Sequence, residues 1–298
     1  MQIPSKQFAD AQIRAMSTLQ RELQDVQTRI ATGNQLLTPI EDPAAAQQIA
    51  LIDDALASEA RRATTLRFAR GQVQLREDVL NDALTVLTRV KEIAITGANG
   101  TMAPSDRANL ATETFQQRES LRQLSNTANE VGAALFGGFQ TRDAPFVQQS
   151  DTVEFRGDQG VQLLPGVDLP IGIATSGASV FGRIETRDGL TDVFAIVGAV
   201  GTALQTGGDV GETLEDIGDA IAHFSNQLAA LGTSLQEIER LVTANTASDL
   251  ALQERRSALA DADIASLAAV LTQGLTTLQA AQHSFIRVGQ MSLFDLLK

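Results

Sequence analysis

The sequence predicts a mainly α-helical chain, with paired N- and C-terminal coiled-coil helices and a small β insert. Three observations support this fold class. Both ends of the chain carry heptad-spaced apolar residues, most of the remainder follows a helical period, and one Gly-rich stretch alternates as strands do. Aromatic residues make up only 4% of the chain and are all Phe, a composition that suits helices packed through Leu, Ile, Val and Ala.

The C-terminal segment, residues 257–298, carries the longer of the two terminal seams. Its apolar residues recur at alternating steps of three and four, which is the pattern of a helix packed against another helix. At about 1.5 Å per residue the stretch from Ile264 onward forms a rod of roughly 50 Å. Because chain ends usually lose order, an apolar stripe that reaches the last residues needs a partner. The stripe comprises Ile264, Leu267, Leu271, Gly274, Leu278, Ala281, Phe285 and Val288, and continues into Met291, Leu293, Phe294, Leu296 and Leu297.

The N-terminal segment repeats the same spacing. The simplest arrangement pairs the first helix with the last and folds the middle of the chain between them. An ordinary bundle whose first and last helices are neighbours fits the pattern equally well. The N-terminal seam comprises Met16, Leu19, Leu23, Val26, Ile30, Gly33 and Leu37.

Start and stop signals divide the first half of the chain into three helices. The first runs from near Ser5 to about Ala31 and ends at Gly33, which can supply a left-handed cap. Asp42 as N-cap, with Pro43 at the first helical position, starts a long second helix over about 44–96. A third helix starts at 104–106. Its four-three pattern runs through Leu110, Thr114, Gln117, Leu121, Leu124, Ala128, Val131 and Leu135.

The pattern changes at Phe136-Gly137-Gly138-Phe139, where two adjacent Gly end the helical period. From here to about Leu190 the chain alternates as half-buried strands do, which predicts a small β insert. The alternating residues are Val153, Phe155, Val161, Leu163, Val167, Leu169, Ile171 and Ile173.

Helical periodicity returns over about 191–204 and again from Leu214 to Leu259, with a break expected at 257–263 before the last helix. The expected domain organisation is therefore threefold. Residues 1–41 and 257–298 form a terminal-helix domain, residues 42–136 and 191–256 form a helical rod, and residues 137–190 form the β domain.

Charge excludes several classes of partner. The net charge is −13, so the chain lacks the basic surface that nucleic acid or an anionic membrane would require. There is no Cys, which excludes disulfides and thiolate chemistry. The first residues do not resemble a cleaved signal peptide, and no uninterrupted run of about 18 apolar residues is present. We therefore expect no nucleic-acid partner and no membrane partner.

No constellation of catalytic or metal-binding residues is evident. His223 and His283 lack paired metal-ligand spacing, and we interpret both as helix-surface or interface residues. Asp261-Ala262-Asp263 lacks the remaining ligands of a calcium loop, so a helix cap is the better interpretation. Gly137-Gly138 does not follow a strand, so it is not a dinucleotide loop. The chain is expected to be no enzyme and to use no cofactor.

Several motifs resemble the flagellin family of bacterial flagellar proteins. Near the N-terminus they are Gln27-Thr-Arg-Ile-Ala-Thr-Gly33 and Glu41-Asp-Pro-Ala-Ala-Ala46. In the middle of the chain they are Ala98-Asn-Gly-Thr101, Leu135-Phe-Gly-Gly-Phe-Gln-Thr141 and Pro145-Phe146. Near the C-terminus they are Ser257-Ala-Leu-Ala-Asp-Ala-Asp-Ile264 and Ser292-Leu-Phe-Asp-Leu296. The Phe-Gly-Gly stretch is similar to that of the hook–filament junction members rather than to filament flagellin. The resemblance covers nearly the whole chain, apart from the interior of the β insert.

The resemblance implies an elongated flagellin-like fold and a structural role: a subunit that joins hook to filament and assembles through its terminal helices. It implies export through the flagellar type III apparatus without a cleaved signal peptide, and an extracellular location. The implied partners are copies of the same chain, a hook-associated protein on the hook side, flagellin on the filament side and an export chaperone at the C-terminal helix. A filament flagellin, major or minor, and an elongated coiled-coil adaptor or adhesin are the alternatives. The expected assembly residues are Leu19, Leu23, Val26, Ile30, Ile264, Leu267, Leu271, Leu278, Phe285, Val288, Leu293 and Phe294.

Overall fold

The computed structural model describes residues 3–160, 162–163 and 172–295, and within them it is mainly α-helical, as predicted. The chain divides into two compact units. Unit 1 consists of residues 1–60 and 247–298, and unit 2 consists of residues 61–246. Two long helices, α2 (Pro43–Gly97) and α6 (Gly211–Ala260), contribute to both units. The finer division into three domains stays a prediction.

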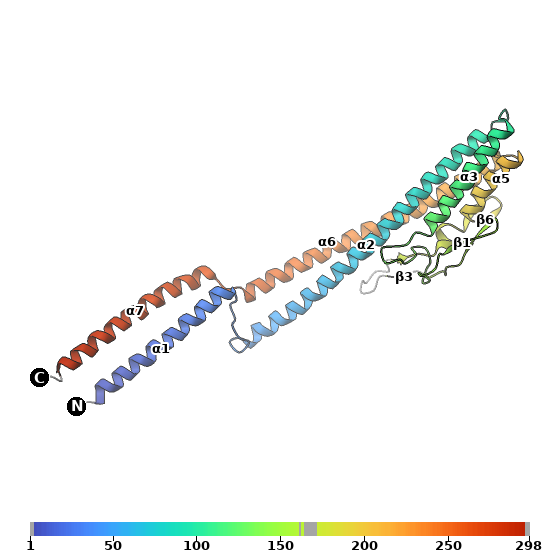
Figure 1. Cartoon of the computed structure of the whole chain (residues 1–298). Coiled ribbons are helices and arrows are strands. Elements are labelled where there is room, and N and C mark those ends of the chain that lie inside the picture. The colour runs from blue at the N-terminus through green and yellow to red at the C-terminus, as the bar shows by residue number, and fades with distance from the viewer. Residues whose placement is uncertain (1–2, 161, 164–171, 296–298) are drawn as a thin grey trace. The chain divides into compact units, whose positions relative to one another are not determined.

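Unit 1 contains the first and last helices, α1 (Ile3–Thr32) and α7 (Ile264–Asp295), which lie side by side and antiparallel (Figure 1). Helix α1 ends where the sequence indicates. Gly33 has a φ of +70° and its N–H donates to the Arg29 carbonyl at 2.9 Å, which is a left-handed helix cap.

Helix α2 starts with the predicted cap. The Asp42 carboxylate accepts a hydrogen bond from the Ala45 N–H at 2.9 Å, and Pro43 occupies the first helical position. In unit 2, α2 packs against α6 through a small apolar cluster of fully or largely buried residues. This cluster comprises Leu66, Ala69, Val73, Ile238 and Leu241.

Helix α3 (Pro104–Ser125) is shorter than the sequence pattern predicts, so the expectation of a helix through Leu135 is wrong. Asn126 ends the helix by pairing its side chain with the Phe146 backbone: its amide donates to the Phe146 carbonyl at 2.7 Å and accepts from the Phe146 N–H at 2.8 Å. The side chain of Asn129 then accepts two backbone N–H groups in a tight turn. Val131 is consequently 82% exposed and takes no part in the core.

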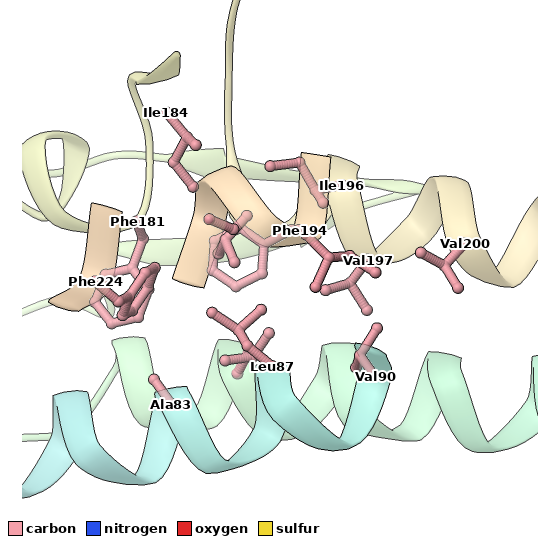
Figure 2. Close-up of a cluster of buried hydrophobic side chains, with 14 of the residues drawn as sticks. Ala83, Leu87, Val90, Phe181, Ile184, Phe194, Ile196, Val197, Val200 and Phe224 are labelled. Carbon is pink, nitrogen blue, oxygen red and sulfur yellow. The ribbon is translucent and has the colours of Figure 1, made fainter. Parts of the chain in front are cut away.

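The main core lies in unit 2, between α2, α3, α5 (Val193–Thr206) and the start of α6. Figure 2 shows Leu87 and Val90 of α2 facing Phe194 and Val197 of α5 across this core. Phe181 is fully buried at its centre, and its ring lies 5.0–6.2 Å from the rings of Phe136, Phe146, Phe194 and Phe224.

The β insert consists of three separate two-stranded antiparallel sheets within the described residues. They are β1 (Phe146–Gln149) with β2 (Thr152–Phe155), β3 (Gln162–Leu163) with β4 (Gly172–Ala174), and β5 (Ile184–Thr186) with β6 (Gly189–Thr191). The short helix α4 (Gly177–Val180) was not predicted. Val153 and Phe155 alternate as expected, half-buried between exposed neighbours. The predicted strand positions Val161, Val167, Leu169 and Ile171 lie outside the described residues.

Helix α5 is capped at both ends, by the Asp192 carboxylate at 2.7 Å from the Ala195 N–H and by left-handed Gly207. Helix α6 continues without a break past Asn245 and Asp249, as its register predicts. Unit 2 also contains one largely buried arginine. Arg76 on α2 donates to the Thr175 hydroxyl at 2.6 Å, and burial lowers the pKa of its guanidinium to about 10.

Candidate assembly surface

The two terminal helices meet at a close contact between a large and a small residue. Leu23 of α1 is only 6% exposed, and it packs over Gly274 of α7. A Cβ atom at position 274 would lie 2.4 Å from the Leu23 Cδ2, so any side chain there would force the Leu23 side chain to move. The predicted partners therefore meet within one chain, each seam covering the other.

The remaining predicted seam residues fall into three groups. Those that are half-buried along the pair are Met16, Leu19, Val26 and Ile30 on α1 and Leu267, Leu271, Leu278, Ala281 and Phe285 on α7. Ile264 is placed at the start of α7 but remains 43% exposed. Val288, Leu293 and Phe294 belong to α7, although their side chains lie outside the described part.

A short backbone clamp joins the inner ends of the two helices. Asn34 and Asp261 form an antiparallel bridge. The Gln35 N–H donates to the Ala260 carbonyl at 2.7 Å, and the Ala262 N–H donates to the Gly33 carbonyl at 2.9 Å. The turn after α1 and the break between α6 and α7 are thereby fixed to one another, which sets the register of the pair.

Side chains reinforce this clamp. Arg29 forms an ion pair with Glu41 at 2.7 Å and also donates to the Gln35 carbonyl. The Asp263 carboxylate accepts from the Ser266 N–H at 3.1 Å, which confirms the interpretation of Asp261-Ala262-Asp263 as a helix cap. Among the described residues no group of His, Cys, Asp and Glu is arranged to hold a metal ion.

The α1–α7 pair leaves a hollow on one of its faces, of about 370 Å³. The lining side chains are small or flexible: Ala11, Gln12, Ala15, Met16, Leu19, Thr277 and Ala281. The Gln12 Oε1 atom is buried there without a hydrogen-bond partner. A buried acceptor of this kind is costly unless something donates to it. We call this feature the hollow.

The same pair carries large apolar side chains that the sequence analysis did not select. Ile13 is 53% exposed, Leu275 41% and Ile286 55%. On α7, Ile264, Leu275 and Ile286 are spaced by eleven residues, or about three helical turns, so they lie along one line of the helix. That spacing was readable in the sequence, but the heptad seam beside it was the stronger signal.

Helix α7 is also unusually poor in charge for an exposed helix. No Asp, Glu, Lys or Arg occurs from Ile264 to Ile286. Within the described residues, Ile264–Arg287 is long and apolar enough to cross a membrane by length and composition, with a mean hydropathy of 1.3. The segment contains no uninterrupted run of about 18 apolar residues, as the sequence analysis states, because Ser, Thr, Gln and His interrupt the Ala, Leu, Ile and Val residues that raise this average. One face of this helix packs on α1, as expected of an amphipathic helix.

Both histidines lie on helix surfaces, as interpreted from the sequence. His283 is exposed on α7. In unit 2, the Nε2 atom of His223 lies 3.0 Å from the Val180 carbonyl and 3.2 Å from the Ser179 carbonyl, so this nitrogen carries a proton and donates to them.

These features define a flagellin-like helical protein, with long paired ends and a small β insert. Residues 4–141 match the family model described as the bacterial flagellin N-terminal helical region. Over its whole length the chain is similar to flagellar hook-associated protein 3 of Escherichia coli, at 26% identity across 318 residues that include 100% of both chains. The resemblance inferred from the sequence is confirmed.

Two further relatives place this similarity in context. The crystal structure of Xanthomonas campestris FlgL in space group C2 superposes with a TM-score of 0.64 at 18% identity, covering 69% of this chain and 99% of that one, which supports the fold. Flagellin A of Vibrio cholerae is 26% identical over 121 residues, only 39% of this chain and 31% of the flagellin.

Proposed function

We propose that this chain is a structural subunit of the bacterial flagellum that joins hook to filament. The observation that carries the proposal is the full-length similarity to hook-associated protein 3, which contrasts with the partial similarity to flagellin A. A junction subunit needs surfaces for two different neighbours as well as for its own copies. This proposal gives the chain an extracellular location in the flagellum, a structural rather than enzymatic role, and no cofactor.

The terminal pair is the proposed assembly surface. Its seam is closed within the chain by contacts such as Leu23 with Gly274, so the pair can act as one unit when it meets its neighbours. Many seam residues are only half-buried, and burying one Leu fully contributes roughly 1.5–3 kcal/mol. Contacts at the edges of the seam can therefore offset the entropy of ordering two long helices. In this proposal the assembly residues are those predicted from the sequence, including Val288, Leu293 and Phe294.

The proposed neighbours follow from the junction role. They are other copies of this chain, a hook-associated protein on one side and flagellin on the other. Helix α7, uncharged from Ile264 to Ile286, is the proposed docking site for an export chaperone before assembly. We further propose that export proceeds through the flagellar type III apparatus without cleavage of a signal peptide.

Deletion of the gene in its own host tests the proposal. Cells should retain hooks, lack filaments and release flagellin into the medium, because flagellin would have no subunit on which to begin. Plasmid-borne full-length chain should restore filaments, whereas a chain that ends at residue 286 should be made but not restore them. Normal filaments in the deletion strain, or with the truncated chain, would contradict the proposal.

Purified protein separates a junction subunit from a filament flagellin. A flagellin should polymerise alone into long filaments under salting-out conditions. The junction subunit should stop at short layers, because its two sides bind different neighbours. Long filaments grown from this chain alone would favour the flagellin alternative.

A further inference from the structure

The α1–α7 pair has two unlike faces, and their difference indicates how copies of the chain meet. The hollow is lined on α1 by Ala11 and Ala15, and Ile13 lies between them in the sequence. Two residues correspond to about 200° around an α-helix, so Ile13 lies on the opposite side of α1 from both alanines. The hollow and this exposed isoleucine therefore belong to opposite faces of the pair.

Helix α7 repeats this arrangement. Thr277 lines the hollow, and the exposed Leu275 lies two residues away, on the opposite side of the helix. Ile286 lies on the same line of α7 as Leu275, because eleven residues make about three turns. We call the surface formed by Ile13, Leu275 and Ile286 the knob face.

The knobs and the hollow also lie at the same level along the pair. Leu23 packs on Gly274, and the helices are antiparallel. Ala11 is twelve residues before Leu23, and Ile286 is twelve residues after Gly274. At about 1.5 Å per residue, both are about 18 Å from that contact in the same direction. Ile13 and Ile286 thus lie directly across the pair from the hollow.

We propose that the knob face of one copy packs into the hollow of the next. This inference rests on the proposed assembly function. A hollow of about 370 Å³ has room for roughly a dozen groups the size of a water molecule, at about 30 Å³ each. That space accommodates the four-carbon side chain of an isoleucine.

A second copy fits these faces in size as well as in shape. Helix α1 has 30 residues and is about 45 Å long, and two adjacent helices are about 20 Å wide. One face of the pair thus offers about 900 Å², close to the roughly 800 Å² that each partner buries in a standard interface. Since α7 lacks charged residues from Ile264 to Ile286, no charge on that helix opposes its burial.

Because the two faces differ, the contact is head-to-tail rather than two-fold symmetric. A head-to-tail contact continues from copy to copy and produces a ring or a helical array. An isolated symmetric dimer would instead place like faces together, knob against knob, and leave both hollows empty.

Engineered cysteines test this directly, because the natural chain has none. Single-cysteine chains I286C, on the knob face, and A15C, in the hollow, are co-expressed in the deletion strain with a wild-type copy. Flagella are then isolated and oxidised, and covalent dimers are measured on non-reducing gels. In the matched control, T276C replaces A15C, because Thr276 is exposed on α7 and faces away from α1. The variant I13C provides a second cysteine on the knob face, contributed by α1.

We expect the mixture of I286C and A15C to give at least tenfold more covalent dimer than either variant alone. The same excess is expected over the control mixture of I286C and T276C. Equal dimer yield from one variant alone would overturn the inference, since it indicates a symmetric contact. Incorporation of the variants without any cross-link from the mixture would also overturn it. Absence of all variants from isolated flagella would instead contradict the proposed function, and cross-linking of concentrated purified full-length chains would then decide the inference separately.

Discussion

Leu23 of α1 and Gly274 of α7 pack so closely that a methyl group at position 274 would lie 2.4 Å from the Leu23 Cδ2. This contact joins residues 251 positions apart in the sequence. Replacing Gly274 with Leu should separate the helices, because overpacking of a close contact costs about 1–3 kcal/mol. Hydrogen exchange should show lost amide protection in α1 and α7 and unchanged protection in α5.

The double variant L23A/G274L supplies the control for this prediction. Removing the Leu23 side chain makes room for the new leucine, so part of the lost protection should return. If the double variant is less protected than G274L alone, the two residues do not share the space that the structure gives them.

Phe181 is the centre of the aromatic core of unit 2 and is fully buried. Replacement by Ala should lower the free energy of unfolding by about 3–5 kcal/mol, as expected for a deleted core aromatic. Phe139 is 63% exposed, so F139A is the matched control and should change this free energy by less than about 1 kcal/mol. Urea denaturation followed by circular dichroism measures both variants, and equal effects would contradict the core assignment.

The N-cap of α5 predicts a smaller effect. The Asp192 carboxylate accepts the Ala195 N–H at 2.7 Å, and losing such a cap costs about 1 kcal/mol. D192A should destabilise unit 2 by this amount, whereas D192N should retain most of the stability because its amide oxygen can still accept. A D192N loss as large as that of D192A would show that the hydrogen bond is not the source of the effect.

The Phe-Gly-Gly loop should be sensitive to acid. The Phe139 and Gly160 N–H groups donate to the Asp158 carboxylate and hold its pKa below the ordinary value. Since the folded pKa lies below the unfolded value of about 3.9, the carboxylate stabilises the loop above that pH. This stabilisation is lost as the pH falls through the folded pKa. The protection factors of the Phe139 and Gly160 amides, which correct for the pH dependence of intrinsic exchange, should therefore fall in acid.

The variant D158A removes the acceptor at every pH and should abolish this acid dependence. Asp143 is exposed in the same region, so D143A is the control and should leave the dependence intact. An acid response that persists in D158A would assign it to another group.

Local sequence signals predicted most of the fold because helix periodicity and caps are encoded within a few residues. Asp42, Pro43 and Gly33 mark helix ends in the structure as they do in the sequence. The end of α3 was missed because a tertiary contact overrides the local pattern: Asn126 pairs with the backbone of Phe146, twenty residues away. Periodicity contains no information about such a partner.

The terminal pair was predictable in part for the same reason. The heptad steps identify which residues of α1 and α7 face inward, and Leu23 with Gly274 shows the two seams in contact. The hollow and the knob face were not predicted, because each is built from residues of both helices and depends on their register. That register is set by the clamp between Gly33–Gln35 and Ala260–Ala262, a contact between the two ends of the chain.

The location of the protein on the cell tests the central claim most directly. Immunogold labelling of intact flagella, with antibody against the full chain, distinguishes a junction subunit from a filament subunit. A junction subunit should give one narrow band of gold where the hook meets the filament. Gold along the filament, or flagella without gold in cells that export the protein, would contradict the account.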